Sequence, residues 1–186
     1  MKFIPTGLEG AYVVDLVFSD DERGGFARSF CAREFEQRGL SQKIVQCNIS
    51  YNHGMGTLRG LHYQQEPATE IKLIRCTRGA IQDVILDLRK DSPTYMQHFS
   101  TILSQDNRKA LYVPGMCAQG YLTLTDDTEV HYYMGEFYRQ GLQTGVRYDD
   151  PAFGIEWRTC VRCISEKDLA WPNYLCRLQQ SEKAIP

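Results

Sequence analysis

The sequence has no long apolar segment. Among its 186 residues, no window approaches the roughly 18 consecutive apolar residues that cross a bilayer. The opening run MKFIPTGLEGAYVVDL lacks the apolar core and the small-residue cleavage site of a secretory signal peptide. These absences argue against a membrane-spanning or secreted protein and predict a soluble one that stays in the cytosol.

Net charge is also small. The 21 Lys and Arg residues nearly balance the 23 Asp and Glu residues, which leaves a formal net charge of −2. This balance gives no general attraction to nucleic acids or anionic membranes, so we expect neither as a partner. An anionic substrate would have to be held by basic side chains placed locally.

Groups that could hold a metal ion are sparse. The four histidines are His53, His62, His98 and His131. No two of them are closely spaced, and the seven cysteines include a single C-x-x-C pair, Cys160 and Cys163, without a second pair to complete a zinc site. We therefore expect no metal, and reduced thiols that are mostly small buried apolar groups.

Helical periodicity is almost absent. Only residues 32–38 and 165–169 show a weak or short 3.6-residue pattern. Short β-rich runs punctuated by turn residues dominate instead. These runs cover residues 11–18, 43–50, 70–76, 80–88, 97–103, 110–113, 120–124 and 130–134. The pattern predicts one all-β domain over residues 1–186, a jelly-roll type of barrel or sandwich with a few short helices.

The alternation of side chains along these runs indicates an interior that could hold a ligand. If residues 58–64 are extended, His62 shares a face with Gly60 and Gln64, opposite Arg59. Three further faces each mix apolar and polar or ionisable side chains: residues 72, 74 and 76; residues 81, 83, 85 and 87; and residues 130, 132 and 134. A barrel interior that binds a ligand has this composition.

His62 is the first candidate for chemistry. It follows a cation and a glycine in Arg59-Gly60-Leu61-His62, among apolar neighbours. A single histidine in such a setting is also typical of a structural residue with satisfied ring nitrogens, so both interpretations stay open from the residues alone. Candidate partners on other segments are Lys72, Asp83, Tyr132 and Asp168.

Several ordered motifs resemble one known family. They are DERGGFARSF, VQCNIS, LRGLHYQ, KLIRCTRGAIQDVILDLRKDSPTY, LYVPGMCAQGYLTL and DDPAFGIEW followed by SEKD. In this order, over residues 3–172, they resemble the dTDP-4-dehydrorhamnose 3,5-epimerase family. The resemblance implies a cupin-type β-barrel, usually a homodimer, that acts on a nucleotide-diphosphate sugar without a cofactor.

The resemblance also implies a chemistry. A 4-keto group acidifies the protons on the neighbouring carbons C3 and C5, so a base can remove a proton from one face and an acid return one to the other. The family's base matches His62, and the carboxylate that orients it matches Asp168. Lys72 matches the cation near the developing oxyanion, and Tyr132 matches the opposing acid.

Binding residues follow from the same match. Arg23 and Arg59 suit the diphosphate because guanidinium groups pair with phosphate oxygens. The remaining residues expected at the substrate are Phe26, Arg28, Gln46, Asn48, Asp83, Gln119, Tyr138 and Lys167. Among them, Phe26 and Tyr138 would hold the nucleobase.

The chain departs from the family pattern near the substrate. Gln119 stands where the family carries a histidine, and Arg28 where a glutamate is usual. An amide cannot titrate near neutral pH, so epimerisation at C3 or C5 alone stays open, as does a cytidine- or guanosine-linked sugar. A catalytically silent binding protein and a metal-dependent cupin enzyme are also compatible with a barrel of this kind.

Overall fold

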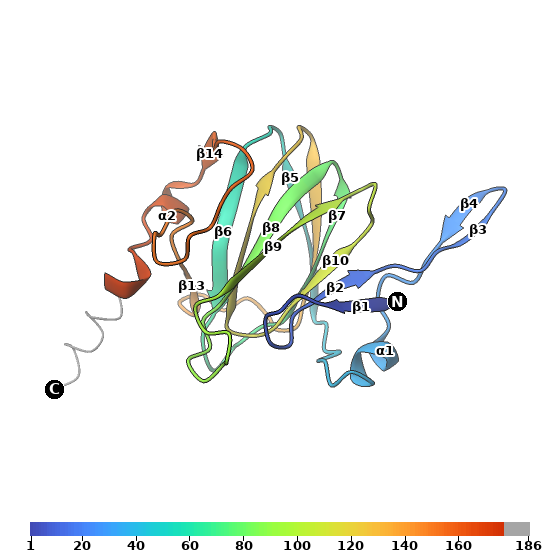
Figure 1. Cartoon of the computed structure of the whole chain (residues 1–186), viewed down its shortest axis with the longest axis horizontal. Helices are drawn as coiled ribbons and strands as arrows, with labels where there is room; N and C mark the ends of the chain where they lie inside the picture. Colours follow the sequence, from blue (N-terminus) through green and yellow to red (C-terminus); the bar gives the residue numbers. More distant parts are fainter. Residues whose placement is uncertain (177–186) are drawn as a thin grey trace.

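Two antiparallel sheets packed face to face form the body of the protein in this computed structural model, which describes residues 1–176. One sheet has the order β1-β2-β10-β7-β12-β5, and the other has the order β13-β6-β11-β8-β9 (Figure 1). The predicted all-β, jelly-roll architecture is confirmed. The last ten residues of the predicted domain, 177–186, lie outside the described residues.

The strands of the first sheet are β1 (Lys2–Pro5), β2 (Tyr12–Asp15), β5 (Gln46–Asn52), β7 (Lys72–Arg78), β10 (Ala110–Val113) and β12 (Thr128–Met134). The second sheet contains β6 (Thr57–Gln64), β8 (Ala80–Asp87), β9 (His98–Ser104), β11 (Cys117–Thr123) and β13 (Gln143–Gly145). Strand β14 (Cys163–Ile164) joins β6 in parallel, and β3 (Ser19–Asp21) with β4 (Gly24–Phe26) forms a separate hairpin. The helices α1 (Ala32–Glu36) and α2 (Glu166–Leu169) are short, as the sequence predicts.

The main core lies between the sheets. Inward side chains of both sheets, such as Ile74, Val130, Ile81 and Ile85, are fully buried there. The alternation predicted for β7, β8 and β12 is therefore confirmed at these positions. A second cluster on the outer face of the first sheet packs against Phe35 of α1. The part of this sheet formed by β2, β10 and β7 is thus covered on both faces.

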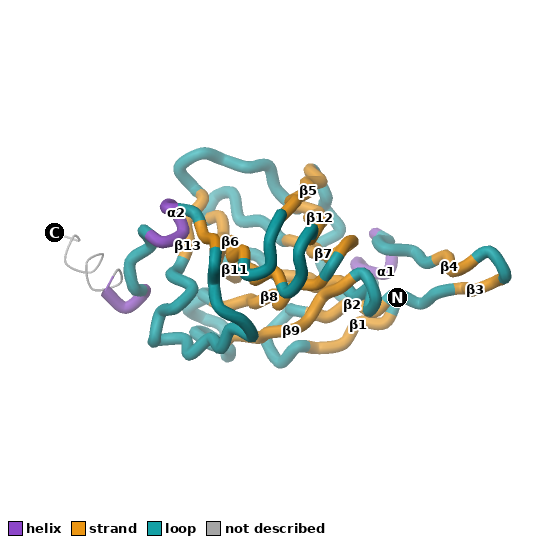
Figure 2. Tube along the Cα trace, turned by 90° about the horizontal axis from the view of Figure 1, so that it is seen from above, coloured by secondary structure: helices purple, strands orange, loops and turns teal. Residues whose placement is uncertain are grey.

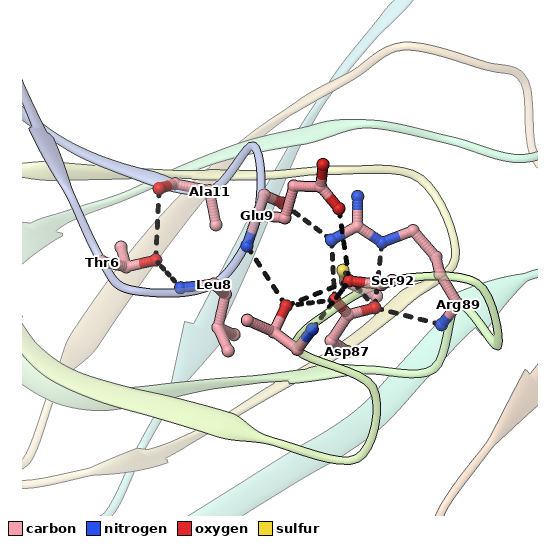
Figure 3. Close-up of polar contacts among 9 residues, drawn as sticks. Thr6, Leu8, Glu9, Ala11, Asp87, Arg89 and Ser92 are labelled. Atoms are coloured by element: carbon pink, nitrogen blue, oxygen red, sulfur yellow. Dashed lines mark hydrogen bonds and ion pairs between the residues drawn. The ribbon is translucent and has the colours of Figure 1, made fainter.

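Asp87 at the end of β8 fastens the N-terminal loop to the barrel (Figure 3). Its carboxylate accepts hydrogen bonds from Arg89, Ser92 and Thr94, with donor–acceptor distances between 2.6 and 3.0 Å. Arg89 also donates to the backbone carbonyl of Glu9 at 2.7 Å. Burial disfavours the charged form, but these donors outweigh it and lower the pKa of Asp87 to about 2.

Strand β6 departs from simple alternation. Gln119 of β11 pairs with His62, and two residues later Tyr121 pairs with Arg59, so β6 has one extra residue at this point. An extra residue of this kind, a β-bulge, turns the following side chains to the other face. The prediction that Arg59 lies opposite His62 is therefore wrong: both side chains line the same pocket.

Gly60 occupies the irregular part of β6 for a steric reason. Its φ is +119°, and a Cβ there would lie 2.5 Å from the Cα of Gly120 and 2.8 Å from the carbonyl oxygen of Gln119. Two glycines on adjacent strands allow this close approach of the backbones.

The cysteine prediction is wrong in part. All seven are free thiols, but only Cys76 and Cys117 are buried, and Cys47, Cys160 and Cys163 are among the four that are exposed. No helix within residues 1–176 is long and apolar enough to cross a membrane.

Candidate active site

A pocket of about 560 Å³ opens at one end of the barrel, between the two sheets. Its walls come from β5, β7 and β12 of one sheet, from β6 and β11 of the other, and from the segment around α2. This volume is typical of sites for small molecules. The predicted site residues that line it are Gln46, Asn48, Arg59, His62, Lys72, Gln119, Tyr132, Tyr138, Lys167 and Asp168.

His62 and Asp168 form a hydrogen-bonded pair although 106 residues separate them. The distance between His62 Nε2 and Asp168 Oδ1 is 2.5 Å, and the Gly60 N–H donates to the other carboxylate oxygen at 3.3 Å. Ser165 caps α2 by accepting a hydrogen bond from the Asp168 N–H at 3.1 Å, which places this carboxylate in the first turn.

The pKa of Asp168 shows how the carboxylate and the imidazole of this pair act on each other. Burial opposes ionisation of Asp168, but the hydrogen bond with His62 and the charge of that ring outweigh it and lower the pKa of Asp168. Because Nε2 is bonded to the carboxylate, the ring orientation is fixed. Among the described residues Nδ1 has no hydrogen-bond partner, so this nitrogen is left for a ligand in the pocket.

Lys72 lies deeper in the pocket and is 5% exposed. Its Nζ donates to the carbonyl oxygen of His62 at 2.8 Å and lies 3.3 Å from Oε1 of Glu70. Glu70 also lines the pocket, although it is not among the residues predicted from the sequence. The signal was present, because residues 70 and 72 are two positions apart in a predicted strand and so share a face.

Tyr132 projects from β12 of the opposite sheet. Burial raises its pKa well above the usual value, and the nearby Tyr121 and Asp83 raise it further. The phenol is therefore protonated at neutral pH and can donate a proton or a hydrogen bond. His62 and Tyr132 thus face one pocket from two different sheets.

Gln119 lies beside His62 on the neighbouring strand and is 5% exposed. Its Nε2 donates to Oδ1 of Asp83 at 2.7 Å. Asp83 itself is fully buried behind Gln119 and does not line the pocket.

Polar side chains at the mouth of the pocket are held by backbone and amide partners. Arg59 Nε donates to Oδ1 of Asn52 at 2.8 Å, which directs the guanidinium along the rim. Oε1 of Gln46 accepts from the backbone N–H of Tyr138 at 2.9 Å, and Lys167 Nζ donates to Gln143 at 2.7 Å. Asn48 is exposed on β5 beside them.

Three predicted binding residues lie away from this pocket. The hairpin β3–β4 projects from the body of the molecule in both views (Figures 1 and 2). Phe26 on it is 80% exposed, and Arg23 pairs only with Asp21 of the same hairpin at 2.6 Å, with its side chain 84% exposed. Arg28 follows the hairpin and pairs with Glu34 of α1 at 3.4 Å.

Within residues 1–176, no three or more His, Cys, Asp and Glu side chains are arranged to hold a metal ion. The pocket instead combines a carboxylate-bound imidazole, a buried ammonium and a protonated phenol. Such a set can remove a proton from carbon, stabilise the resulting oxyanion and return a proton from another side.

Comparisons with known proteins agree with this chemistry. The family model for dTDP-4-dehydrorhamnose 3,5-epimerase matches residues 5–175. A dTDP-4-dehydrorhamnose 3,5-epimerase of Methanothermobacter thermautotrophicus is 40% identical over 173 residues, which cover 91% of this chain and 92% of the relative.

Two solved structures are similar along nearly the whole chain. The dTDP-4-dehydrorhamnose 3,5-epimerase of Bacillus anthracis, with TDP and pyrophosphate bound, has a TM-score of 0.88 at 40% identity and covers 92% of this chain and 98% of its own. ChmJ, a 3'-monoepimerase of Streptomyces bikiniensis in complex with dTDP-quinovose, has a TM-score of 0.87 at 29% identity and covers 95% of this chain and 90% of its own.

Proposed function

The chain belongs to the dTDP-4-dehydrorhamnose 3,5-epimerase family and is an isomerase of that kind, and we propose that His62 and Tyr132 are the two groups that move protons on its dTDP-4-keto-6-deoxyhexose substrate. The observation that carries this proposal is that His62 of one sheet, paired with Asp168 of α2, and Tyr132 of the other sheet line a single pocket. Inversion at carbon requires groups on opposite faces of the sugar ring, which opposite walls can supply.

In this mechanism Nδ1 of His62 removes the proton from a carbon beside the 4-keto group. The electron pair moves into the ring to give an enolate, whose oxygen is stabilised by the ammonium of Lys72. Asp168 stabilises the imidazolium that forms, and Glu70 holds Lys72 in place. The phenol of Tyr132 then donates its proton to the opposite face of the carbon.

The nucleotide would occupy the mouth of the pocket. Arg59 supplies a positive charge there, and Gln46, Asn48 and Tyr138 supply amide and aromatic surfaces for the sugar and the base. The relatives with TDP or a dTDP-sugar bound support a thymidine nucleotide for this chain too.

We further propose that the working unit is a homodimer in which the hairpin β3–β4 of one copy reaches the pocket of the other. An aromatic side chain that is 80% exposed on a projecting hairpin supports an intermolecular role. Arg23 and Phe26 would then contact the diphosphate and the base of the partner's substrate. The four exposed free thiols are consistent with our placing this dimer in the reducing cytosol.

Replacing Tyr132 by Phe tests the proposed division of labour. The substrate is incubated in deuterated water, and NMR reports both deuterium incorporation and configuration at C3 and C5. His62 alone can still remove the proton and return deuterium to the same face of the carbon, which retains the configuration. The variant should therefore exchange, but it should invert the configuration about a hundredfold more slowly than the wild type. Equal loss of exchange and inversion would contradict the role of Tyr132.

The same spectra distinguish a second candidate activity. Gln119 replaces a histidine beside the base, and one structural relative is a 3'-monoepimerase. Wild-type exchange at both carbons would establish a 3,5-epimerase, whereas exchange confined to C3 would establish a monoepimerase.

A further inference from the structure

Asp83 is a buried carboxylate with one unused oxygen. It is 0% exposed in the middle of β8, and its Oδ1 accepts the hydrogen bond from Gln119 at 2.7 Å. Its Oδ2 is buried and has no hydrogen-bond partner. One oxygen of the ionised carboxylate is thus buried without a partner. This raises the free energy of the charged form and favours binding of a proton by Asp83.

Gln119 connects this carboxylate to the pocket. Its Nε2 points to Asp83, while no described residue donates to its Oε1. Oε1 is not one of the buried side-chain atoms that lack a partner, so it is open to the pocket that Gln119 lines. In this orientation the acceptor Oε1 of Gln119 faces the pocket. It lies next to His62, the residue of β6 that pairs with Gln119 of β11.

We propose that Asp83, acting through Gln119, determines whether the pocket presents a hydrogen-bond acceptor or a donor to the sugar beside His62. The ionised carboxylate holds Nε2, so Oε1 accepts from a sugar hydroxyl. When Asp83 takes up a proton, its O–H donates to Oε1, the carboxamide turns over, and the NH₂ group faces the pocket. Asp83 is thus a positioning residue, and the identity of the ligand rests on the proposed function.

The surroundings of Asp83 are consistent with a change near neutral pH. Burial raises the pKa of Asp83 to about 7, against the Gln119 hydrogen bond and the charge of Lys72, which lower it. The other ionisable groups that act on it are Cys76 of β7, whose pKa burial raises to about 11, and Tyr132 of β12, whose pKa is also raised. Both stay neutral at pH 7, and Lys72 is the only cation among them.

The two orientations of the Gln119 carboxamide select different substituents on the sugar. Above pH 7 the acceptor binds a donor such as a sugar hydroxyl and leaves a carbonyl or an oxyanion at the same place without a partner. Below pH 7 the donor can bind any of these groups, because a hydroxyl oxygen also accepts.

NMR of the free protein tests the switch without any substrate. In protein labelled with ¹³C and ¹⁵N, the Asp83 carboxyl carbon and the Gln119 carboxamide should titrate together with a midpoint near pH 7. Asp83→Asn should abolish the Gln119 change. Asp87 on the same strand, whose pKa is lowered to about 2, should not titrate between pH 5 and 9.

Gln64 is the matched control for the carboxamide. Its Nε2 donates to the carbonyls of Ala68 and Phe137, and its Oε1 accepts from the Arg139 N–H, so it has no reason to turn. An Asp83 carboxyl that does not titrate between pH 5 and 9, or a Gln119 signal that is unchanged while it does, would overturn the proposal. This wild-type measurement holds even if Asp83→Asn does not fold.

Kinetics then test the effect on the substrate. KM is measured at pH 6 and pH 8.5 for the dTDP-4-keto-6-deoxyhexose and for analogues that carry a carbonyl in place of the 2- or the 3-hydroxyl. Relative to one of the analogues, the KM of the hydroxyl-bearing sugar should be about tenfold lower at the higher pH than at the lower, and Gln119→Met should remove this difference. A ratio of KM values that is the same at both pH values would contradict the proposal. Absence of turnover with every 4-keto sugar would instead contradict the proposed function and leave the NMR result standing.

Discussion

Two aspartates on β8 show how strongly the surroundings determine the chemistry of one residue type. Asp83 and Asp87 are both fully buried, yet the pKa of the first is raised to about 7 and that of the second is lowered to about 2. Asp83 receives the amide donor of Gln119 and a backbone hydrogen bond from Val84, whereas Asp87 receives donors from a guanidinium, two hydroxyls and a backbone N–H. The number and charge of the donors decide the direction.

The low pKa of Asp87 makes a prediction about acid stability. An unfolded aspartate has a pKa of about 3.9, so the folded state holds its proton more weakly and gains about 2 kcal/mol above pH 4. This contribution is lost as the pH falls from about 4 to about 2. We expect Asp87→Asn to lower the free energy of unfolding in urea by about 2 kcal/mol at pH 7 and to flatten its decline between those pH values.

Asp91 is the control for this change. It is exposed in the loop that follows β8, and Asp91→Asn should alter stability by less than about 0.5 kcal/mol. A loss at pH 7 that persists unchanged at pH 2 would show that the effect of Asp87→Asn is not electrostatic.

At the scale of elements, the sequence predicts the regular strands better than the bulge in β6, which orients side chains in the active site. The run 110–113 coincides with β10, and 80–88 exceeds β8 by one residue, because both are apolar segments bounded by turn residues. The bulge in β6, the three-residue strand β13 and the two-residue strand β14 leave no such pattern. Each depends on a neighbouring strand distant in sequence, which local alternation does not report.

The bulge itself can be tested at Gly60. In Gly60→Ala the new Cβ would meet the backbone of residues 119 and 120 at less than 3 Å and occupy a positive φ, while the contact from the Gly60 N–H to Asp168 would shift. We expect a loss of stability of more than about 3 kcal/mol, or failure to fold, by thermal and urea unfolding. Gly54→Ala, where nothing lies within 4 Å of the new atom, should change stability by less than about 0.5 kcal/mol. Similar values for the two variants would argue against a steric role for Gly60.

At the scale of the whole molecule, the pocket and the hairpin divide the predicted site into two parts. Ten of the predicted residues line one pocket, whereas Arg23 and Phe26 lie on the projecting hairpin. The motifs predict that all of these residues belong to the site, but a sequence carries no information on whether they act within one chain or between two. That distinction depends on where the hairpin points.

Mixed dimers can decide between the two arrangements. One tagged copy carries His62→Ala, and a second copy, with another tag, carries both Arg23→Ala and Phe26→Ala. Each homodimer should be nearly inactive. If the hairpin acts on the partner, each mixed dimer has one intact site, so random mixing should restore about a quarter of the wild-type activity per site. No recovery in purified mixed dimers would mean that each hairpin serves its own chain, whereas an active homodimer of the hairpin variant would mean that the hairpin serves neither site.

The proposed mechanism depends on His62, oriented by Asp168, to remove the proton from carbon. Its most direct measurement is the rate of deuterium incorporation beside the 4-keto group of the substrate in deuterated water. We expect His62→Ala to lower this rate about a thousandfold, whereas His131→Ala, on the outer face of β12 beside Glu129, should retain the wild-type rate. Wild-type incorporation by folded His62→Ala would contradict the account.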